Sequence, residues 1–188
     1  MLVLASQSLR RREILTQAGI THSVRVSGID ECRRSGEGPE EYVCRLAREK
    51  AAAVEAQPEE FVLAADTTVV AGDHVLEKPH SPADAARMLR ILSGREHVVM
   101  TGVCLRRGAG RWEIVEKTKV RFTTLSEEEV LSYSNSGEPL DKAGGYAIQG
   151  MASRYIEGIE GCYFNVVGLP IARVYRLLRD AGYSFSRG

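Results

Sequence analysis

Residues 61–71 read FVLAADTTVVA, an apolar run interrupted by one carboxylate and two hydroxyl groups. Its length and its β-branched residues predict a buried strand, Gly72-Asp73 predicts a turn, and Val75-Leu76 predicts a short return strand. Outward from this hairpin, apolar strand-like segments alternate with amphipathic helix-like segments over the first two thirds of the chain. The alternation predicts an α/β fold.

Helices are predicted wherever Ser or Pro opens a segment with apolar residues at helical spacing. These helices cover residues 8–18, 39–56 and 81–94, a short segment whose capping box pairs Ser126 with Glu129, and a last helix opened by Pro170. Further strands are predicted at residues 2–5, 97–106 and 114–122, with short strands after Gly150. Polar and apolar residues alternate in the 114–122 segment, which indicates antiparallel pairing and therefore a mixed twisted sheet with flanking helices.

The composition limits the classes of partner. The 188 residues carry 25 basic and 25 acidic side chains, a formal net charge of zero, which argues against a nucleic-acid or membrane partner. No apolar run approaches the roughly 20 residues of a membrane span, and the N-terminus lacks the pattern of a secretory signal. We expect a soluble, cytoplasmic protein whose residues 1–188 form a single domain.

Cysteine and histidine spacing argues against several metal sites. Cys32, Cys44, Cys104 and Cys162 form no C-x-x-C pair, and the four histidines form no H-E-x-x-H motif. A metal in this protein would therefore be held by carboxylate oxygens, which favours Mg²⁺ or Mn²⁺.

The first predicted strand runs into an arginine-rich helix start, SQSLRRR at residues 6–12. A helix N-terminus carries a positive partial charge, so cations there are unfavourable unless an anion lies nearby. Serine hydroxyls, free backbone N–H groups and guanidinium groups together can bind phosphate. Solvated arginines, or pairing with Glu13, remain the alternative.

Two charged residues interrupt apolar faces. Lys50 points within about 20° of Val43 around the predicted helix axis, and Asp66 lies inside the 61–71 strand. Lys50 either extends its ammonium group to solvent or meets an anion. Asp66 either satisfies a turn or needs a metal, a cation or several N–H donors. The hairpin would carry Lys78 back towards Asp66, and Asp30-Glu31 offers two more carboxylates.

The sequence contains neither a P-loop nor a dinucleotide-binding glycine motif, and no Ser-His-Asp arrangement is visible. Arginine, lysine, serine and carboxylate side chains remain. They suit phosphoryl or nucleotidyl transfer by positioning, charge neutralisation and metal-bound water.

Together these segments resemble the Maf family of nucleoside triphosphate pyrophosphatases. Residues 4–11 (LASQSLRR) resemble the family's L-A-S-x-S-P-R-R, residues 45–51 (RLAREKA) its R-L-A-x-x-K-A, and residues 65–69 (ADTTV) its A-D-T-x-V. The family's order continues with Lys78-Pro79, DKAG at 141–144, IQG at 148–150 and NVVGLP at 165–170. The resemblance covers nearly the whole chain.

The resemblance implies two lobes around a deep cleft, as in inosine triphosphate pyrophosphatases, and a homodimer. It implies hydrolysis of dTTP and UTP, and of modified pyrimidine nucleotides, between the α- and β-phosphates with Mg²⁺ or Mn²⁺, which would cleanse the nucleotide pool and be linked to cell division arrest. In the implied site, Asp66 is the general base, and Asp66 and Glu31 hold the metal. Lys50 and Lys78 are catalytic cations, and Ser8, Arg10 and Arg11 bind the triphosphate. Arg10, Thr67 and Gln149 occupy the positions that distinguish the dTTP and UTP branch.

Two alternatives stay open: the same chemistry on another base, such as methylated guanosine triphosphate, or a non-catalytic nucleotide-binding regulator of cell division. The sequence departs from the family pattern at Leu9, where proline is usual, at Ala147, where glycine is common, and at Cys162, where a small hydroxyl residue is usual. If the backbone at Ala147 required a positive φ, alanine would shift the loop that presents Gln149.

Overall fold

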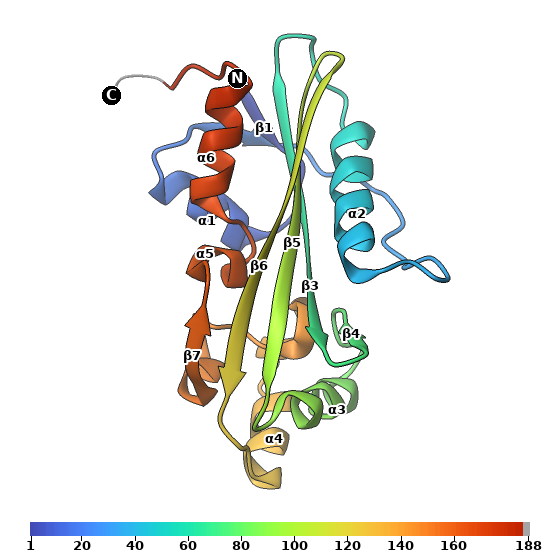
Figure 1. Cartoon of the computed structure of the whole chain (residues 1–188), viewed down its shortest axis with the longest axis vertical. Helices are drawn as coiled ribbons and strands as arrows, with labels where there is room; N and C mark the ends of the chain where they lie inside the picture. Colours follow the sequence, from blue (N-terminus) through green and yellow to red (C-terminus); the bar gives the residue numbers. More distant parts are fainter. Residues whose placement is uncertain (186–188) are drawn as a thin grey trace. The chain divides into compact units, whose positions relative to one another are not determined.

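The computed structural model describes residues 1–185. Within them, seven strands form one mixed sheet in the order β2-β1-β3-β5-β6-β7, with β4 paired to β3 (Figure 1). The strands are β1 (Leu2–Leu4), β2 (His22–Val24), β3 (Phe61–Ala71), β4 (His74–Leu76), β5 (Glu96–Arg107), β6 (Gly110–Phe122) and β7 (Ile156–Glu160). Pairing is parallel where β1 meets β2 and β3, and antiparallel for β3 with β4 and β6 with β7. The predicted mixed α/β sheet is confirmed.

The predicted helices are present with small changes in their ends. They are α1 (Leu9–Gln17), α2 (Pro39–Ala53), α3 (Pro82–Leu92), α4 (Glu127–Ser134) and α6 (Ile171–Asp180). The structure adds the short helix α5 (Tyr163–Val167) and the 3-10 turns η1 (Glu138–Asp141), η2 (Ala143–Gly145) and η3 (Met151–Tyr155). The capping box of Ser126 and Glu129 is confirmed. Of the short strands expected after Gly150 only β7 forms, because the residues after Gly161 turn into α5. No helix among residues 1–185 is both long and apolar enough to traverse a bilayer.

The chain divides into two compact units, in agreement with the expected lobes. Among the described residues, the first unit contains residues 1–66, 101–116 and 168–185, and the second contains residues 67–100 and 117–167. Strands β3, β5 and β6 each pass from one unit into the other. The boundary on β3 falls between Asp66 and Thr67.

In the first unit, α2 lies on one side of the strands, and α1 and α6 lie on the other (Figure 1). Val62 and Ala64 of β3 share a buried cluster with Ala47 and Ala51 of α2. Since strand side chains alternate between faces, Asp66 projects to the same side as Val62 and Ala64, towards α2. The hydrophobic pattern that docks the helix therefore also directs Asp66.

Gly102 of β5 allows α2 to come this close. A Cβ atom built at residue 102 would lie 2.4 Å from the carbonyl oxygen of Val43 and 2.8 Å from the backbone nitrogen of Cys44. Carbon does not approach backbone atoms that closely without displacement. The helix that carries Lys50 thus rests directly on the strand backbone.

The core of the second unit joins its strands to α3, α4 and the 3-10 turns. It contains Leu89 and Leu92 from α3, Phe122 from β6, Tyr133 from α4 and Tyr146. Burial lowers the pKa of His97 to about 4, so the ring is neutral near pH 7, and its Nε2 atom lies 2.7 Å from the Tyr146 hydroxyl. His97 therefore has a packing role in this core.

Candidate active site

The structure brings three predicted site residues of the first unit into one ionic cluster. Lys50 Nζ lies 2.6 Å from Asp66 Oδ1 and 2.9 Å from Glu31 Oε1. The side chains of Lys50 and Asp66 are 8% and 10% exposed, whereas that of Glu31 is 44% exposed. Of the two open possibilities for Lys50, the structure shows the one in which it meets an anion. A buried charge is stable only with such partners.

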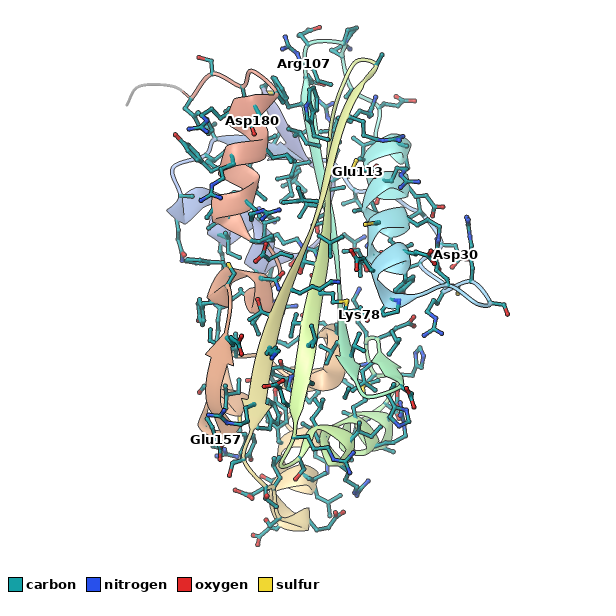
Figure 2. The ribbon with its side chains drawn as sticks, in the orientation of Figure 1. Asp30, Lys78, Arg107, Glu113, Glu157 and Asp180 are labelled. Atoms are coloured by element: carbon teal, nitrogen blue, oxygen red, sulfur yellow. The ribbon has the colours of Figure 1, made fainter. Side chains whose placement is uncertain are left out.

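The predicted pair Asp30-Glu31 separates. Asp30 Oδ1 accepts a hydrogen bond from the backbone N–H of Cys32 at 3.0 Å. Hydrogen bonding to the Cys32 side chain, and then to this N–H, lowers the pKa of Asp30. Figure 2 shows Asp30 on the loop that extends beyond α2. Glu31 instead turns to Lys50, so this loop contributes one carboxylate to the cluster.

Arg11 is buried and holds backbone carbonyl groups. Its Nε donates to the Gly168 oxygen at 2.8 Å, and its Nη1 donates to the Ala65 oxygen at 2.7 Å and to Ser6 Oγ at 3.3 Å. Burial lowers the pKa of Arg11, and the nearby charge of Asp66 partly opposes that effect. The guanidinium group is therefore a structural tie next to Asp66 as well as a positive charge near it.

Ser8 and Arg10 lie at the start of α1. Ser8 is the N-cap, and its hydroxyl accepts a long hydrogen bond of 3.4 Å from the Arg11 N–H. A side chain at the first turn of a helix lies close to free backbone N–H groups, the setting in which anions bind. Leu9, which stands where the family has proline, still begins the helix at the expected place and is 66% exposed.

Arg45 fastens the loop that carries Glu31 to α2. Its Nε and Nη2 donate to both carboxylate oxygens of Glu37 at 2.6 and 2.8 Å, and its Nη2 also donates to the Cys32 carbonyl at 3.1 Å. The Tyr42 hydroxyl donates to the Glu31 carbonyl at 2.9 Å. In the sequence, Arg45 stands out only as the first residue of the RLAREKA motif at 45–51. Its position eight residues after Glu37, across a helix start, was the available signal.

Glu31 and Asp66 have the chemistry that a hard divalent cation requires. Carboxylate oxygens are the preferred ligands of Mg²⁺, which commonly binds one or two carboxylates and completes its shell with water and phosphate oxygens. Residues 1–185 contain no group of three or more His, Cys, Asp or Glu side chains placed to hold a metal. Glu31 and Asp66 thus supply the number of carboxylates with which Mg²⁺ commonly binds.

Thr67, Lys78 and Gln149 belong to the second unit. Thr67 follows Asp66 directly on β3, and Lys78, which is exposed, lies in the segment after β4 (Figure 2). The predicted hairpin is confirmed, with Leu76 opposite Val69. Gln149 is exposed on the irregular turn that precedes η3.

The backbone before Gln149 uses glycine where it needs a positive φ. Gly144 and Gly145 have φ values of 72° and 68°, and a Cβ at Gly144 would lie 2.7 Å from a Val69 methyl group. Among residues 1–185, no residue other than glycine has a positive φ, so Ala147 stands at a position that alanine adopts without strain. The departure from the family at Ala147 does not distort the turn.

Comparison with known proteins identifies the relatives of this chain. The family model described as Maf-like protein matches residues 1–181. The dTTP/UTP pyrophosphatase of Koribacter versatilis (strain Ellin345) is 55% identical over 184 residues, which cover 96% of this chain and 94% of that protein. The dTTP/UTP pyrophosphatase of Anaeromyxobacter sp. (strain Fw109-5) is 54% identical over 187 residues, which cover 97% and 90%.

Among solved structures, a HAM1 protein from Coxiella burnetii aligns with a TM-score of 0.49 at 12% identity, covering 95% of this chain and 98% of that one. The family model spans nearly all of the chain, and the relatives named above are more than half identical to it over at least 90% of both lengths. The chain therefore belongs to the Maf family.

Proposed function

We propose that this protein hydrolyses dTTP and UTP to the nucleoside monophosphate and pyrophosphate with the help of a divalent cation. The observation that carries the proposal is the cluster of Lys50 with Asp66 and Glu31 at 2.6 and 2.9 Å, built on the motifs that the resemblance assigns to catalysis. The two relatives with 55% and 54% sequence identity, both named dTTP/UTP pyrophosphatase, support the choice of substrate.

Glu31 and Asp66 would hold the cation, Mg²⁺ or Mn²⁺, through their oxygens. When bound, the cation would neutralise charge on the phosphate oxygens and lower the pKa of a coordinated water. Lys50 contacts both carboxylates in the structure and so offsets their mutual repulsion. The arrangement keeps the buried carboxylate of Asp66 and the exposed carboxylate of Glu31 on the same ammonium group.

The reaction joins one water molecule to the α-phosphorus and breaks the bond between that phosphorus and the oxygen bridging to the β-phosphate. Asp66 would accept the proton of the attacking water, and pyrophosphate would leave. Lys50, Lys78 and Arg10 would stabilise the negative charge on the triphosphate, with Ser8 and the N–H groups of α1 as further donors. Arg11 would contribute its charge while its N–H groups hold Ala65 and Gly168.

Gln149, with Thr67 and Arg10, would select the base. A glutamine amide offers one acceptor and two N–H donors, which suits the N3–H and a neighbouring carbonyl of uracil or thymine. Cytosine has an acceptor at N3, and an unsatisfied polar group in such a site costs about 1 to 3 kcal/mol. That range corresponds to a preference of about 5- to 150-fold for UTP over CTP.

We further propose that residues 1–188 form one catalytic domain and that the protein is a homodimer. It would act in the cytoplasm, where it would remove unwanted nucleotides. Cys32, Cys44, Cys104 and Cys162 are all free thiols, which suits a reducing compartment. Sedimentation velocity at micromolar concentration tests the dimer, which a single monomeric species would contradict.

Pyrophosphate release from a panel of triphosphates, with Mg²⁺ and with Mn²⁺, tests the proposed function. The panel contains dTTP, UTP, CTP, ATP, GTP and a methylated GTP, and chromatography identifies the monophosphate. We expect kcat/KM to be highest for dTTP and UTP. A maximum on methylated GTP would assign another base, and tight nucleotide binding without product would support the regulator instead.

A further inference from the structure

Gln149 is exposed, and it lies on a turn whose two ends are hydrogen-bonded to side chains from other segments. The Ala147 N–H donates to the Tyr133 hydroxyl at 3.2 Å, and the Met151 N–H donates to Glu138 Oε2 at 3.1 Å. The Gly150 N–H closes the turn by donating to the Ala147 carbonyl at 3.1 Å. The backbone on both sides of Gln149 is thus bonded to two side chains from elsewhere in the second unit.

Tyr133 and Glu138 are themselves joined. The Tyr133 hydroxyl donates to Glu138 Oε1 at 2.7 Å while it accepts from Ala147. Tyr133 is completely buried, and its burial together with the bond to Glu138 raises its pKa well above the ordinary value. The phenol therefore keeps its proton and donates it to Glu138, while its oxygen accepts from the turn.

The Glu138 carboxylate also occupies the space next to Gly150 of the turn. A Cβ built at Gly150 would lie 2.3 Å from Glu138 Oε1 and 2.5 Å from Oε2, so the carboxylate is in contact with the backbone next to Gln149. The backbone of Glu138 is bonded as well, because its carbonyl accepts from Lys142 Nζ at 2.6 Å. One carboxylate thus accepts a hydrogen bond at the end of the turn and packs against the Gly150 backbone.

We infer that Tyr133 and Glu138 are positioning residues that fix the direction of Gln149 and thereby set the choice of base without touching the nucleotide. The inference rests on the proposed function, because it takes Gln149 as the side chain that reads the base. A glutamine on a loose turn could rotate to satisfy either uracil or cytosine, since its amide carries both donor and acceptor. Selectivity requires that the backbone be held.

The test measures the ratio of kcat/KM for UTP to that for CTP. Tyr133→Phe removes the hydroxyl but keeps the ring, and we expect the ratio to fall about 2- to 10-fold, the equivalent of one hydrogen bond, with little change in kcat for UTP. Glu138→Gln puts an NH2 group, which cannot accept, in place of one carboxylate oxygen, so it cannot keep both the bond from Tyr133 to Oε1 and the bond from Met151 to Oε2, and we expect a larger fall. It also serves if Tyr133→Phe does not fold.

The matched control is Tyr155→Phe. Tyr155 is buried in the same unit and its ring packs edge-on against Tyr133 at 6.0 Å, but its hydroxyl accepts from Arg154. Loss of this hydroxyl should leave the UTP to CTP ratio unchanged. A fall equal to that of Tyr133→Phe would overturn the inference, because any cavity in this core would then have the same effect.

The decisive comparison repeats Tyr133→Phe in a Gln149→Ala background. If Tyr133 acts through Gln149, its substitution has no further effect on the ratio there. An equal fall in both backgrounds would show a general structural role and overturn the inference.

Amide hydrogen exchange separates this inference from the proposed function. Tyr133→Phe should speed exchange at Ala147, and Glu138→Gln should speed exchange at Met151, whichever triphosphate is hydrolysed. Unchanged exchange overturns the positioning role, even if UTP is the preferred substrate. Faster exchange in a protein without a pyrimidine preference supports the positioning role and rejects only the proposed substrate.

Discussion

The cluster at Asp66 and the turn at Gln149 hold their side chains by different means. Asp66 is held by charge, in a nearly buried contact with Lys50. Gln149 is exposed, and its turn is held by hydrogen bonds to Tyr133 and Glu138. Removing one partner of a buried ion pair costs about 3 to 5 kcal/mol, whereas one lost hydrogen bond costs about 1 kcal/mol. Substitutions near the proposed reaction centre should therefore be severe, and those near the proposed base site should be mild.

The largest expected effect is on the charged side. Asp66→Asn keeps the shape of the side chain but removes its charge and basicity, so we expect pyrophosphate release from UTP to fall on the order of 10³-fold. Asp73→Asn, on the exposed turn after β3, serves as the control. Near wild-type release by a folded Asp66→Asn protein, judged by circular dichroism, would remove Asp66 from the catalytic role.

The second prediction measures how strongly charge holds this cluster. Lys50→Met leaves Asp66 buried without the ammonium group that lies 2.6 Å from it, and we expect the free energy of unfolding in urea to fall by about 3 to 5 kcal/mol. The double variant Lys50→Met, Asp66→Asn should recover much of that loss because it removes both charges of the buried pair. A double variant no more stable than Lys50→Met would show that packing, and not the ion pair with Asp66, holds α2 in place.

A smaller effect should appear as acid sensitivity of the first unit. Hydrogen bonds from Arg45 lower the pKa of Glu37 to about 2, below its ordinary value of 4.5. The stability that this carboxylate contributes is present above pH 4.5 and is lost as the pH falls towards 2. We therefore expect Glu37→Gln to lower Tm at pH 7 but not at pH 2.

Thermal unfolding between pH 2 and pH 7 measures this difference. Glu59→Gln removes an exposed carboxylate from the same unit and controls for net charge. Parallel Tm curves for wild type and Glu37→Gln at every pH would contradict the assigned role of Arg45.

The smallest effect is expected on the turn. Ala147 has no positive φ, so Ala147→Gly relieves no strain and adds only flexibility to the unfolded chain. We expect the free energy of unfolding to fall by less than about 1 kcal/mol and the UTP to CTP ratio to stay within about twofold of wild type. A clear gain in selectivity with glycine would mean that Ala147 restricts the turn.

The ease of predicting each region from sequence follows from the same difference. Lys50 and Asp66 were identified because a charge in an apolar pattern conflicts with burial, and such a conflict is visible in the residues themselves. The hairpin and helices followed from periodicity and capping residues. The Tyr133 hydroxyl and Glu138 carried no such conflict, since both are ordinary polar groups near a turn.

Other features needed coordinates for different reasons. The carbonyl partners of Arg11 come from Ala65 and Gly168, which are 54 and 157 residues away along the chain, and a backbone oxygen leaves no mark in a sequence. Likewise α5 is only five residues long, too short for a helical period to be distinguished from a strand.

The contact of Gly102 with α2 has a consequence for selection experiments. In a saturation library selected for activity, residue 102 should be depleted of every side chain, alanine included, because the first carbon would already collide with the Val43 carbonyl. Its tolerance profile would resemble that of a residue in contact with substrate. A position in this protein that tolerates no substitution can therefore indicate close packing of a helix on a strand, and not only contact with substrate.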